Sequence, residues 1–352
     1  MQMMKLGKTG PEASRFGLGC MGMSGMYGPS DRSESLATIA AALEAGVTLL
    51  DTGDFYGMGH NELLIAEALK HQDRDKVLLS VKFGAQRDPS GGWIGFDGRP
   101  SAVKTSLAYT LNRLGVDHID IYRPARLDPN VPIEDTIGAI ADMVQAGHVR
   151  HIGVSELGSA SLRKAAMVHP IADLQIEYSL MSRGIEDDIL ATCRELGIGI
   201  TAYGVLSRGL ISGHWQPSKG NVAGDFRSHG PRFQGDNEAR NLALAEALSK
   251  VATAKGMTTA QAAIAWVMAQ GDDIMPLIGA RRRDRLAGLI VEAARETGLA
   301  RHAGVDGALL DAAVAAGVQG VIVAGTGNGT VHRALEVALQ RARERGVVVV
   351  RA

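Results

Sequence analysis

The sequence of 352 residues predicts a closed (β/α)8 barrel. Eight short, largely apolar segments have the character of β-strands, and amphipathic helical stretches separate them. Strands joined by helices pair in parallel, and the 45% hydrophobic content allows a core of the size that such a fold needs. An open, doubly wound parallel sheet is the alternative, but eight comparable strand–helix units favour closure.

The predicted strands share β-branched, apolar residues bounded by turn residues. They are 16–21, 47–52, 77–83, 119–123, 149–155, 173–178, 199–205 and 273–278. Helices are predicted from the capping residues before them and the glycines after them. The expected helices are 36–43 behind the capping box Asp31/Glu34, 103–114 capped by Ser101, 134–146 before Gly147, and 262–268 behind the capping box Thr258/Gln261.

One connection, 206–241, is unusually long and has little periodicity. Long connections in compact domains are usually functional or disordered. Its aromatic residues Trp215, Phe226 and Phe233 are candidates to line a pocket, and we assign Trp215 to a substrate site. A plain surface loop is the alternative interpretation.

The composition excludes several classes of protein. Lys and Arg number 37 and Asp and Glu 38, so the concentrated basic surface of a nucleic-acid binder is not expected. Cys20 and Cys193 lie far apart and the histidines are scattered, so neither a disulfide framework nor a metal site is predicted. No apolar run reaches the roughly 18–20 residues of a membrane span, and no secretory signal is visible. A cytoplasmic location is the expectation.

Polar residues mark the carboxyl ends of the predicted strands, where a (β/α)8 barrel holds its chemistry. Asp51 ends the second strand, Tyr56 follows it, and Lys82 ends the third. A lysine beside a tyrosine favours the phenolate, and a carboxylate holds the lysine charged, so this trio suits proton transfer to a developing alkoxide. An ordinary buried Asp–Lys pair with a tyrosine nearby is the alternative.

Seven stretches in order resemble the aldo-keto reductase family over about residues 4–287. They are 6–10 (LGKTG), 16–24 (FGLGCMGMS), 51–57 (DTGDFYG), 81–84 (VKFG), 153–156 (GVSE), 202–210 (AYGVLSRGL) and 276–286 (PLIGARRRDRL). The resemblance implies a (β/α)8 barrel that reduces carbonyls with NADPH, and an N-terminal hairpin over the bottom of the barrel.

The resemblance assigns catalytic roles to Asp51, Tyr56 and Lys82. The histidine that is typical of the family does not carry over, because Ala125 stands at its position. Arg126 or Arg123 is a candidate replacement donor, which favours a substrate with an anionic or strongly polar group next to the carbonyl. A simple ion pair between Arg126 and Asp128 is the alternative.

The resemblance also implies a cofactor site for NADP(H). Ser155 and Gln175 match the residues at the carboxamide, and Tyr203 matches the aromatic ring that stacks on the nicotinamide. The loop along the pyrophosphate corresponds to Gly204, Leu206, Arg208 and Gly209, and the 2′-phosphate site to Gly279, Arg281 and Arg285. Clustered arginines at a helix start call for an anion, and guanidinium groups pair well with phosphate.

The C-terminal residues 303–352 are similar to the C-terminal part of a bacterial type II-like asparaginase, through 303–307 (AGVDG), 324–330 (AGTGNGT) and 347–352. Asn328 corresponds to a residue that reaches a neighbouring subunit in those enzymes, but the nucleophilic threonines are missing. We therefore expect a fusion, with a barrel at 1–290 and an appendage at 291–352. The appendage is predicted as helix 308–316, strand 321–324, helix 331–345 and strand 347–350, and it is a candidate for self-association.

The resulting hypothesis is an NADPH-dependent oxidoreductase that reduces an aldehyde or ketone, with Tyr56 as proton donor and a small-molecule carbonyl compound as partner. The alternative is an NADP(H)-binding, catalytically weak or inactive interaction protein. A scaffold without a ligand is a third possibility, if the appendage disturbs the last helix of the barrel.

Overall fold

The computed structural model describes residues 1–215, 225, 227, 230–286, 320–323, 333–345 and 348–351. Contacts divide the chain into two compact units. The first comprises Met1–Val205, Ala223–Asp225 and Gly271–Ile290, and the second comprises Leu206–Val222, Phe226–Gln270 and Val291–Ala352. The expected domain boundary between residues 290 and 291 stays a prediction.

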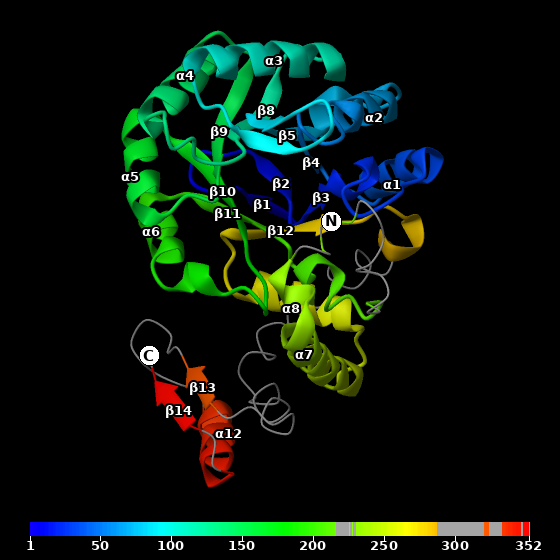
Figure 1. The fold of residues 1–352 in the computed structure, drawn as a ribbon, viewed down its shortest axis with the longest axis vertical. Coiled ribbons are helices and arrows are strands. Elements are labelled where there is room, and N and C mark those ends of the chain that lie inside the picture. Colours follow the sequence, from blue (N-terminus) through cyan, green and yellow to red (C-terminus); the bar gives the residue numbers. More distant parts are fainter. Residues whose placement is uncertain are drawn as a thin grey trace. The chain divides into compact units, whose positions relative to one another are not determined.

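The first unit contains a closed, all-parallel barrel of eight strands, which confirms the predicted fold class (Figure 1). In barrel order, the strands are β3 (Gly17–Gly19), β4 (Leu49–Gly53), β5 (Leu78–Phe83), β8 (Ile119–Pro124), β9 (Val149–Ser155), β10 (Ile171–Glu177), β11 (Gly199–Tyr203) and β12 (Ile274–Gly279), and β12 pairs back with β3. Each strand falls within about two residues of a predicted segment. Their nearly continuous burial reflects the helices and side chains that cover both faces.

Among the described residues of this unit, six α-helices lie between the strands in sequence, together with the short helices η1 (Met21–Ser24), η2 (Arg74–Lys76) and η3 (Gly184–Glu186). They are α1 (Arg32–Glu44), α2 (His60–Leu69), α3 (Pro100–Leu114), α4 (Ile133–Gln145), α5 (Ser159–Val168) and α6 (Ile189–Leu196). Asp31 caps α1 by accepting a hydrogen bond from the Glu34 N–H at 2.7 Å, but the other half of the predicted capping box is not formed, because the Glu34 carboxylate pairs with Arg283. The prediction for Ser101 is wrong. Arg99 is the N-cap of α3, because Pro100 fits the first helical position, where no N–H is needed.

The predicted N-terminal hairpin covers the amino-terminal end of the barrel. Strands β1 (Met3–Lys5) and β2 (Glu12–Ser14) pair antiparallel, and Met4, Leu6 and Ala13 join the apolar cluster inside the barrel. Gly7 has φ of +66°, and a Cβ there would lie 2.2 Å from the carbonyl oxygen of Ala172 at the start of β10. Only glycine allows the turn of the hairpin to approach the barrel so closely.

A second hairpin, not predicted from the sequence, lies between β5 and α3. It consists of β6 (Ala85–Arg87) and β7 (Trp93–Phe96), which pair antiparallel. Its turn is held by the Asp88 carboxylate, which accepts hydrogen bonds from the N–H groups of Ser90 (2.9 Å) and Gly92 (2.8 Å). The segment is rich in glycine and polar residues and lacks the alternation by which strands are identified.

The second unit has its own elements. They are η4 (Ser207–Gly209), η7 (Pro231–Phe233), α7 (Gly235–Ala254), α8 (Thr259–Ala269), β13 (Gly320–Val323), α12 (Arg333–Glu344) and β14 (Val348–Arg351). The capping box of α8 is confirmed, because Thr258 and Gln261 exchange side chain–backbone hydrogen bonds of 2.7 and 3.2 Å. Helix α7 begins within the connection that was expected to be irregular to residue 241.

In the C-terminal appendage, β13 and β14 pair in parallel and α12 lies between them in sequence, as predicted. Leu339 and Ala342 of α12 are buried. The predicted helix 308–316 and Asn328 lie outside the described residues, as does Phe226 of the long connection. Across the described part of the chain, no helix combines the length and apolarity that a membrane crossing requires.

Replacing Gly7 tests the close approach of the hairpin to the barrel. Gly25 is a matched control, because it also has a positive φ of +81° but has open space where a Cβ would be. We expect Gly25→Ala to cost about 1–2 kcal/mol from backbone strain, and Gly7→Ala to cost a further 1–3 kcal/mol, roughly, from the clash with Ala172. Urea unfolding measures both. Equal midpoints for the two variants would contradict the close contact.

Candidate active site

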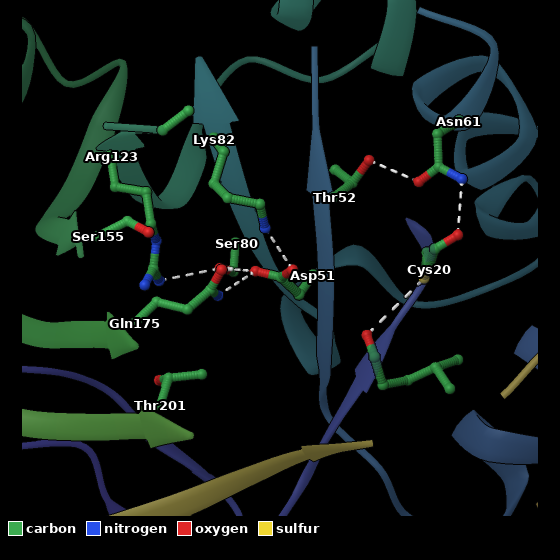
Figure 2. Close-up of polar contacts among 12 residues, drawn as sticks. Cys20, Asp51, Thr52, Asn61, Ser80, Lys82, Arg123, Ser155, Gln175 and Thr201 are labelled. Atoms are coloured by element: carbon green, nitrogen blue, oxygen red, sulfur yellow. Dashed lines mark hydrogen bonds and ion pairs between the residues drawn. The ribbon is translucent and has the colours of Figure 1, made fainter. Parts of the chain in front are cut away.

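A buried ion pair lies at the carboxyl ends of two neighbouring strands, β4 and β5. The Lys82 Nζ donates a hydrogen bond of 2.5 Å to Asp51 Oδ1 (Figure 2), and the two residues are only 3% and 2% exposed. Burial lowers the pKa of Lys82, and the negative charge of Asp51 opposes that effect. Because an ammonium is strongly disfavoured away from water, Asp51 is what favours the charged form of this lysine.

The second oxygen of the same carboxylate is also occupied. Asp51 Oδ2 accepts hydrogen bonds from Ser80 Oγ at 2.9 Å and from Gln175 Nε2 at 2.6 Å. Ser80 lies two residues before Lys82 on β5, whereas Gln175 reaches in from β10 (Figure 2). Asp51 is therefore fixed by three donors and in turn orients the amide of Gln175. Ser80 was missed from the sequence, although the alternation of a strand places it on the same face as Lys82.

Tyr56 lies next to this pair. Its side chain is 6% exposed, and the Lys82 Nζ is 5.1 Å from the centre of its ring. The sequence led us to expect a lowered pKa for the phenol. Instead, the pKa of Tyr56 is raised well above its usual value. Burial is the largest cause, and the negative charge of Asp51 is the second. The penalty for burying a phenolate outweighs the attraction of the positive charge of Arg126. Tyr56 therefore keeps its proton, as a proton donor must.

The position of the missing histidine is filled by backbone and a methyl group. Ala125 is 2% exposed, and its N–H donates to the Phe83 carbonyl oxygen at 2.8 Å. Arg123, one candidate replacement, is fully buried and donates to Asp173 Oδ2 at 2.9 Å. It also donates to Ser80 Oγ at 3.0 Å (Figure 2). This ion pair belongs to the barrel interior, which removes Arg123 as a substrate donor.

Arg126, the other candidate, is exposed next to the cluster. Its Nη1 donates to the Ala125 carbonyl oxygen at 2.6 Å and to Ser155 Oγ at 3.5 Å. The expected alternative, a pair with Asp128, is wrong. Among the described residues Asp128 accepts hydrogen bonds from backbone N–H groups instead, including that of Gly98 at 3.0 Å. The positive charge of Arg126 partly opposes the rise in the pKa of Tyr56, so its guanidinium acts on the phenol.

Three of the residues assigned to the nicotinamide lie at the ends of consecutive strands. Ser155 ends β9, Gln175 lies in β10, and Tyr203 ends β11. Ser155 and Gln175 are buried, whereas Tyr203 is half-buried. The Tyr203 hydroxyl bonds to the Glu156 carboxylate, and Glu156 has φ of +54°, an unusual conformation that often accompanies function. Gly204 follows Tyr203 with φ of +67°.

The arginines after β12 have protein partners, contrary to the expectation that they need an external anion. Arg281 Nη1 donates to the carbonyl oxygens of Tyr27 and Pro29, both at 3.1 Å. Arg283 forms a forked pair with Glu34, with contacts of 3.0 and 3.2 Å. Arg285 lies 3.9 Å from Asp284 and is more loosely held. Gly279 is exposed at the end of β12.

The remaining candidates belong to the second unit. Leu206 precedes η4, which contains Arg208 and Gly209. The backbone of Arg208 has the left-handed conformation, with φ of +59°. Its carbonyl oxygen accepts a hydrogen bond of 3.1 Å from Arg227 Nη1. Trp215 is half-buried and packs on Phe233, with ring centres 4.7 Å apart, and Arg227 lies 5.0 Å from its ring centre. In the described ranges, His, Cys, Asp and Glu do not gather into a group that would hold a metal ion.

Comparison with known proteins agrees with this arrangement. The model of the aldo/keto reductase family matches residues 15–305, and the model of the glutaminase/asparaginase C-terminal domain matches residues 298–352. Both resemblances seen in the sequence are confirmed.

Solved structures with this fold cover most of the chain. The glycerol dehydrogenase AKR11B4 from Gluconobacter oxydans is 28% identical, with a TM-score of 0.74 over 85% of this chain and 95% of its own. The aldo-keto reductase AKR11C1 from Bacillus halodurans, in its holo form, is 25% identical, with a TM-score of 0.70 over 86% of this chain and 96% of its own. The thermostable aldo-keto reductase Tm1743, in complex with the inhibitor epalrestat, is 27% identical, with a TM-score of 0.66 over 84% of this chain and 94% of its own.

The buried pair Arg123–Asp173 predicts a large difference between single and double variants. Asp173→Leu leaves a charged guanidinium buried without its partner, so we expect a loss of about 3–5 kcal/mol in the free energy of unfolding. The double variant Arg123→Met with Asp173→Leu is expected to recover most of that loss.

The exposed pair Arg163–Glu195 serves as the control, with side chains 47% and 61% exposed. Arg163→Met should cost less than about 1 kcal/mol. Chemical denaturation followed by circular dichroism measures all four proteins. A double variant no more stable than Asp173→Leu would contradict this account.

Proposed function

Because this chain belongs to the aldo/keto reductase family, we propose that it reduces an aldehyde or a ketone to an alcohol with NADPH, and that Tyr56 donates the proton. The observation that supports this most is the cluster at the ends of β4 and β5, where the buried Asp51–Lys82 pair lies against a protonated phenol. A buried acid beside a buried cation suits protonation of an oxygen that gains negative charge.

The proposed roles follow from charge. Bound NADPH would supply the hydride that reduces the carbonyl carbon. Tyr56 transfers its proton to the carbonyl oxygen and becomes a phenolate, which is costly in a buried site. Lys82, with Nζ 5.1 Å from the ring centre, stabilises this phenolate, and Asp51 keeps Lys82 charged and oriented.

The residues at the ends of β9, β10 and β11 fit a nicotinamide. Tyr203 offers the face of a half-buried ring for stacking, because its hydroxyl is anchored to Glu156. The side-chain amide of Gln175 donates a hydrogen bond to Asp51. Its carbonyl oxygen is thereby directed to accept a hydrogen bond from an amide N–H. We assign the carboxamide to Gln175 and Ser155, and the pyrophosphate to Gly204, Leu206, Arg208 and Gly209.

The preference for NADPH over NADH is proposed from the arginines after β12. Arg285 is exposed and only loosely paired, and Arg281 and Gly279 lie on the same segment, so these three are assigned to the 2′-phosphate. Arg283 is not included, because Glu34 already occupies its guanidinium fork.

Arg126 is the proposed substrate donor in place of the missing histidine, and Trp215 is kept as a substrate candidate. A guanidinium favours substrates with a polar or anionic group next to the carbonyl. The glycerol dehydrogenase among the similar structures is named for a polar substrate, which fits such a donor.

We also propose that the chain is a fusion whose appendage plays no part in the reduction. Self-association through the appendage and a cytoplasmic location stay predictions.

The alternative is a protein that binds NADP(H) but turns over little. Ala125 is the observation that favours it, since a methyl group offers no hydrogen bond to the carbonyl oxygen.

Tyr56→Phe distinguishes the two functions. We expect the variant to lose about 10²- to 10⁴-fold in kcat with an aldehyde substrate, because the proton donor is gone, while its affinity for NADPH stays within about twofold. Turnover is followed by NADPH absorbance, and binding by the quenching of tryptophan fluorescence, with NADH measured alongside. NADPH binding without turnover in the wild-type protein would establish the alternative.

The variant Asp51→Asn tests whether Asp51 keeps Lys82 charged, and the pH profile of the reaction is the measurement. Burial lowers the pKa of Lys82 and Asp51 raises it, so without the carboxylate the pKa falls further and Lys82 loses its proton at lower pH. The alkaline limb of the pH profile of kcat/KM is therefore expected to move to lower pH, by about one to three units. Ser80→Ala is the control, because it removes a neutral partner of the same carboxylate. An unmoved limb in Asp51→Asn would refute the role given to this pair.

A further inference from the structure

Exposed apolar side chains follow three neighbouring strands at the carboxyl-terminal rim of the barrel. After β5, the β6–β7 hairpin presents Trp93 (54% exposed), Ile94 (62%) and Phe96 (38%). The connection after β4 presents Met58 (60% exposed), and the connection after β8 presents Leu127 (39%). Since β4, β5 and β8 are neighbours in the barrel, these residues follow three adjacent strand ends. Exposed apolar surface at this end of the barrel is available to an apolar part of a ligand.

This apolar rim is connected to the proposed proton donor by aromatic contacts. The rings of Trp93 and Phe55 have centres 5.8 Å apart at an interplanar angle of 64°, and those of Phe55 and Tyr56 have centres 4.8 Å apart at 76°. Both are edge-to-face contacts, which aromatic rings prefer. The path runs from a largely exposed indole to a buried phenol, so a molecule whose reacting oxygen meets Tyr56 has apolar surface beside it.

The hairpin holds Trp93 in place. The Arg87 guanidinium lies 4.0 Å from the centre of the indole ring, and Arg87 also donates to the Gly91 carbonyl oxygen at 3.3 Å and to Met26 Sδ at 3.2 Å. The strand pairing shifts register between Gln86 and Arg87, and such bulges are common beside active sites, where they redirect side chains. A ring fixed in this way binds a ligand with little loss of conformational freedom.

We propose that the β6–β7 hairpin is a substrate subsite, in which Trp93 binds an aryl group attached to the carbonyl carbon. The proposal rests on the proposed reduction and specifies its substrate class. The aryl ring packs on Trp93 and Phe55 while the carbonyl oxygen meets Tyr56, and Arg126 stays available to a polar neighbour of the carbonyl. Small aliphatic aldehydes reach Tyr56 without contacting the hairpin.

The test compares an aryl aldehyde, benzaldehyde, with a small aliphatic one, propanal, in steady-state assays with NADPH. For Trp93→Ala we expect kcat/KM with benzaldehyde to fall about tenfold, mainly through KM, while kcat/KM with propanal stays within twofold. Trp93→Phe keeps a ring and should retain most of the activity with benzaldehyde. Tyr109→Ala is the control, because Tyr109 is a similarly exposed aromatic residue (62%) on α3. It should leave both values unchanged.

Equal losses with both aldehydes, or no loss with either, would overturn the subsite. Sedimentation velocity on the wild type and Trp93→Ala tests whether a second copy of the chain occupies the rim instead. If the variant breaks up a wild-type oligomer without changing the preference between aldehydes, the rim is a contact between copies of the chain and the proposal falls. A wild-type protein that reduces neither aldehyde would defeat the proposed function itself, and the subsite with it.

Discussion

The candidate site depends on a lysine ammonium that is held inside the barrel by one carboxylate. Lys82 is nearly completely removed from water, an environment that by itself favours the neutral amine. Asp51 opposes this preference by direct contact, and Ser80 and Gln175 fix Asp51 so that it cannot turn away. Two of these four residues belong to β5, one to β4 and one to β10, so the closure of the barrel is what brings them together.

The charges inside the barrel form a connected system. Arg123 and Asp173 make a second buried pair, and Arg123 shares Ser80 with Asp51, so the two pairs are linked through one hydroxyl. Tyr56 is neutral in this environment, since burial raises its pKa. The site is thus prepared to supply a proton, and a negative charge left on Tyr56 would lie near Lys82 and within the influence of Arg126.

The chain combines two families in one sequence. The matches to the aldo/keto reductase and glutaminase/asparaginase models overlap over residues 298–305, so one family model runs directly into the other. The described part of the appendage is one strand–helix–strand unit, formed by β13, α12 and β14. Its two strands pair with each other in parallel. An isolated two-stranded unit is in general only marginally stable in water.

The sequence alone predicted the barrel, its eight strands and the grouping of Asp51, Lys82 and Tyr56 at the strand ends. These follow from local patterns: apolar runs, capping residues such as Thr258 and Asp31, and polar residues at strand ends. The tertiary structure decided the rest, because the answers depend on residues distant in sequence. The partner of Arg123 is 50 residues away, and the anion that pairs with Arg283 comes from α1, 249 residues earlier. The pKa of Tyr56 depends on burial, which no local pattern measures, and the hairpin that carries Trp93 is set by turn contacts and by packing on Phe55.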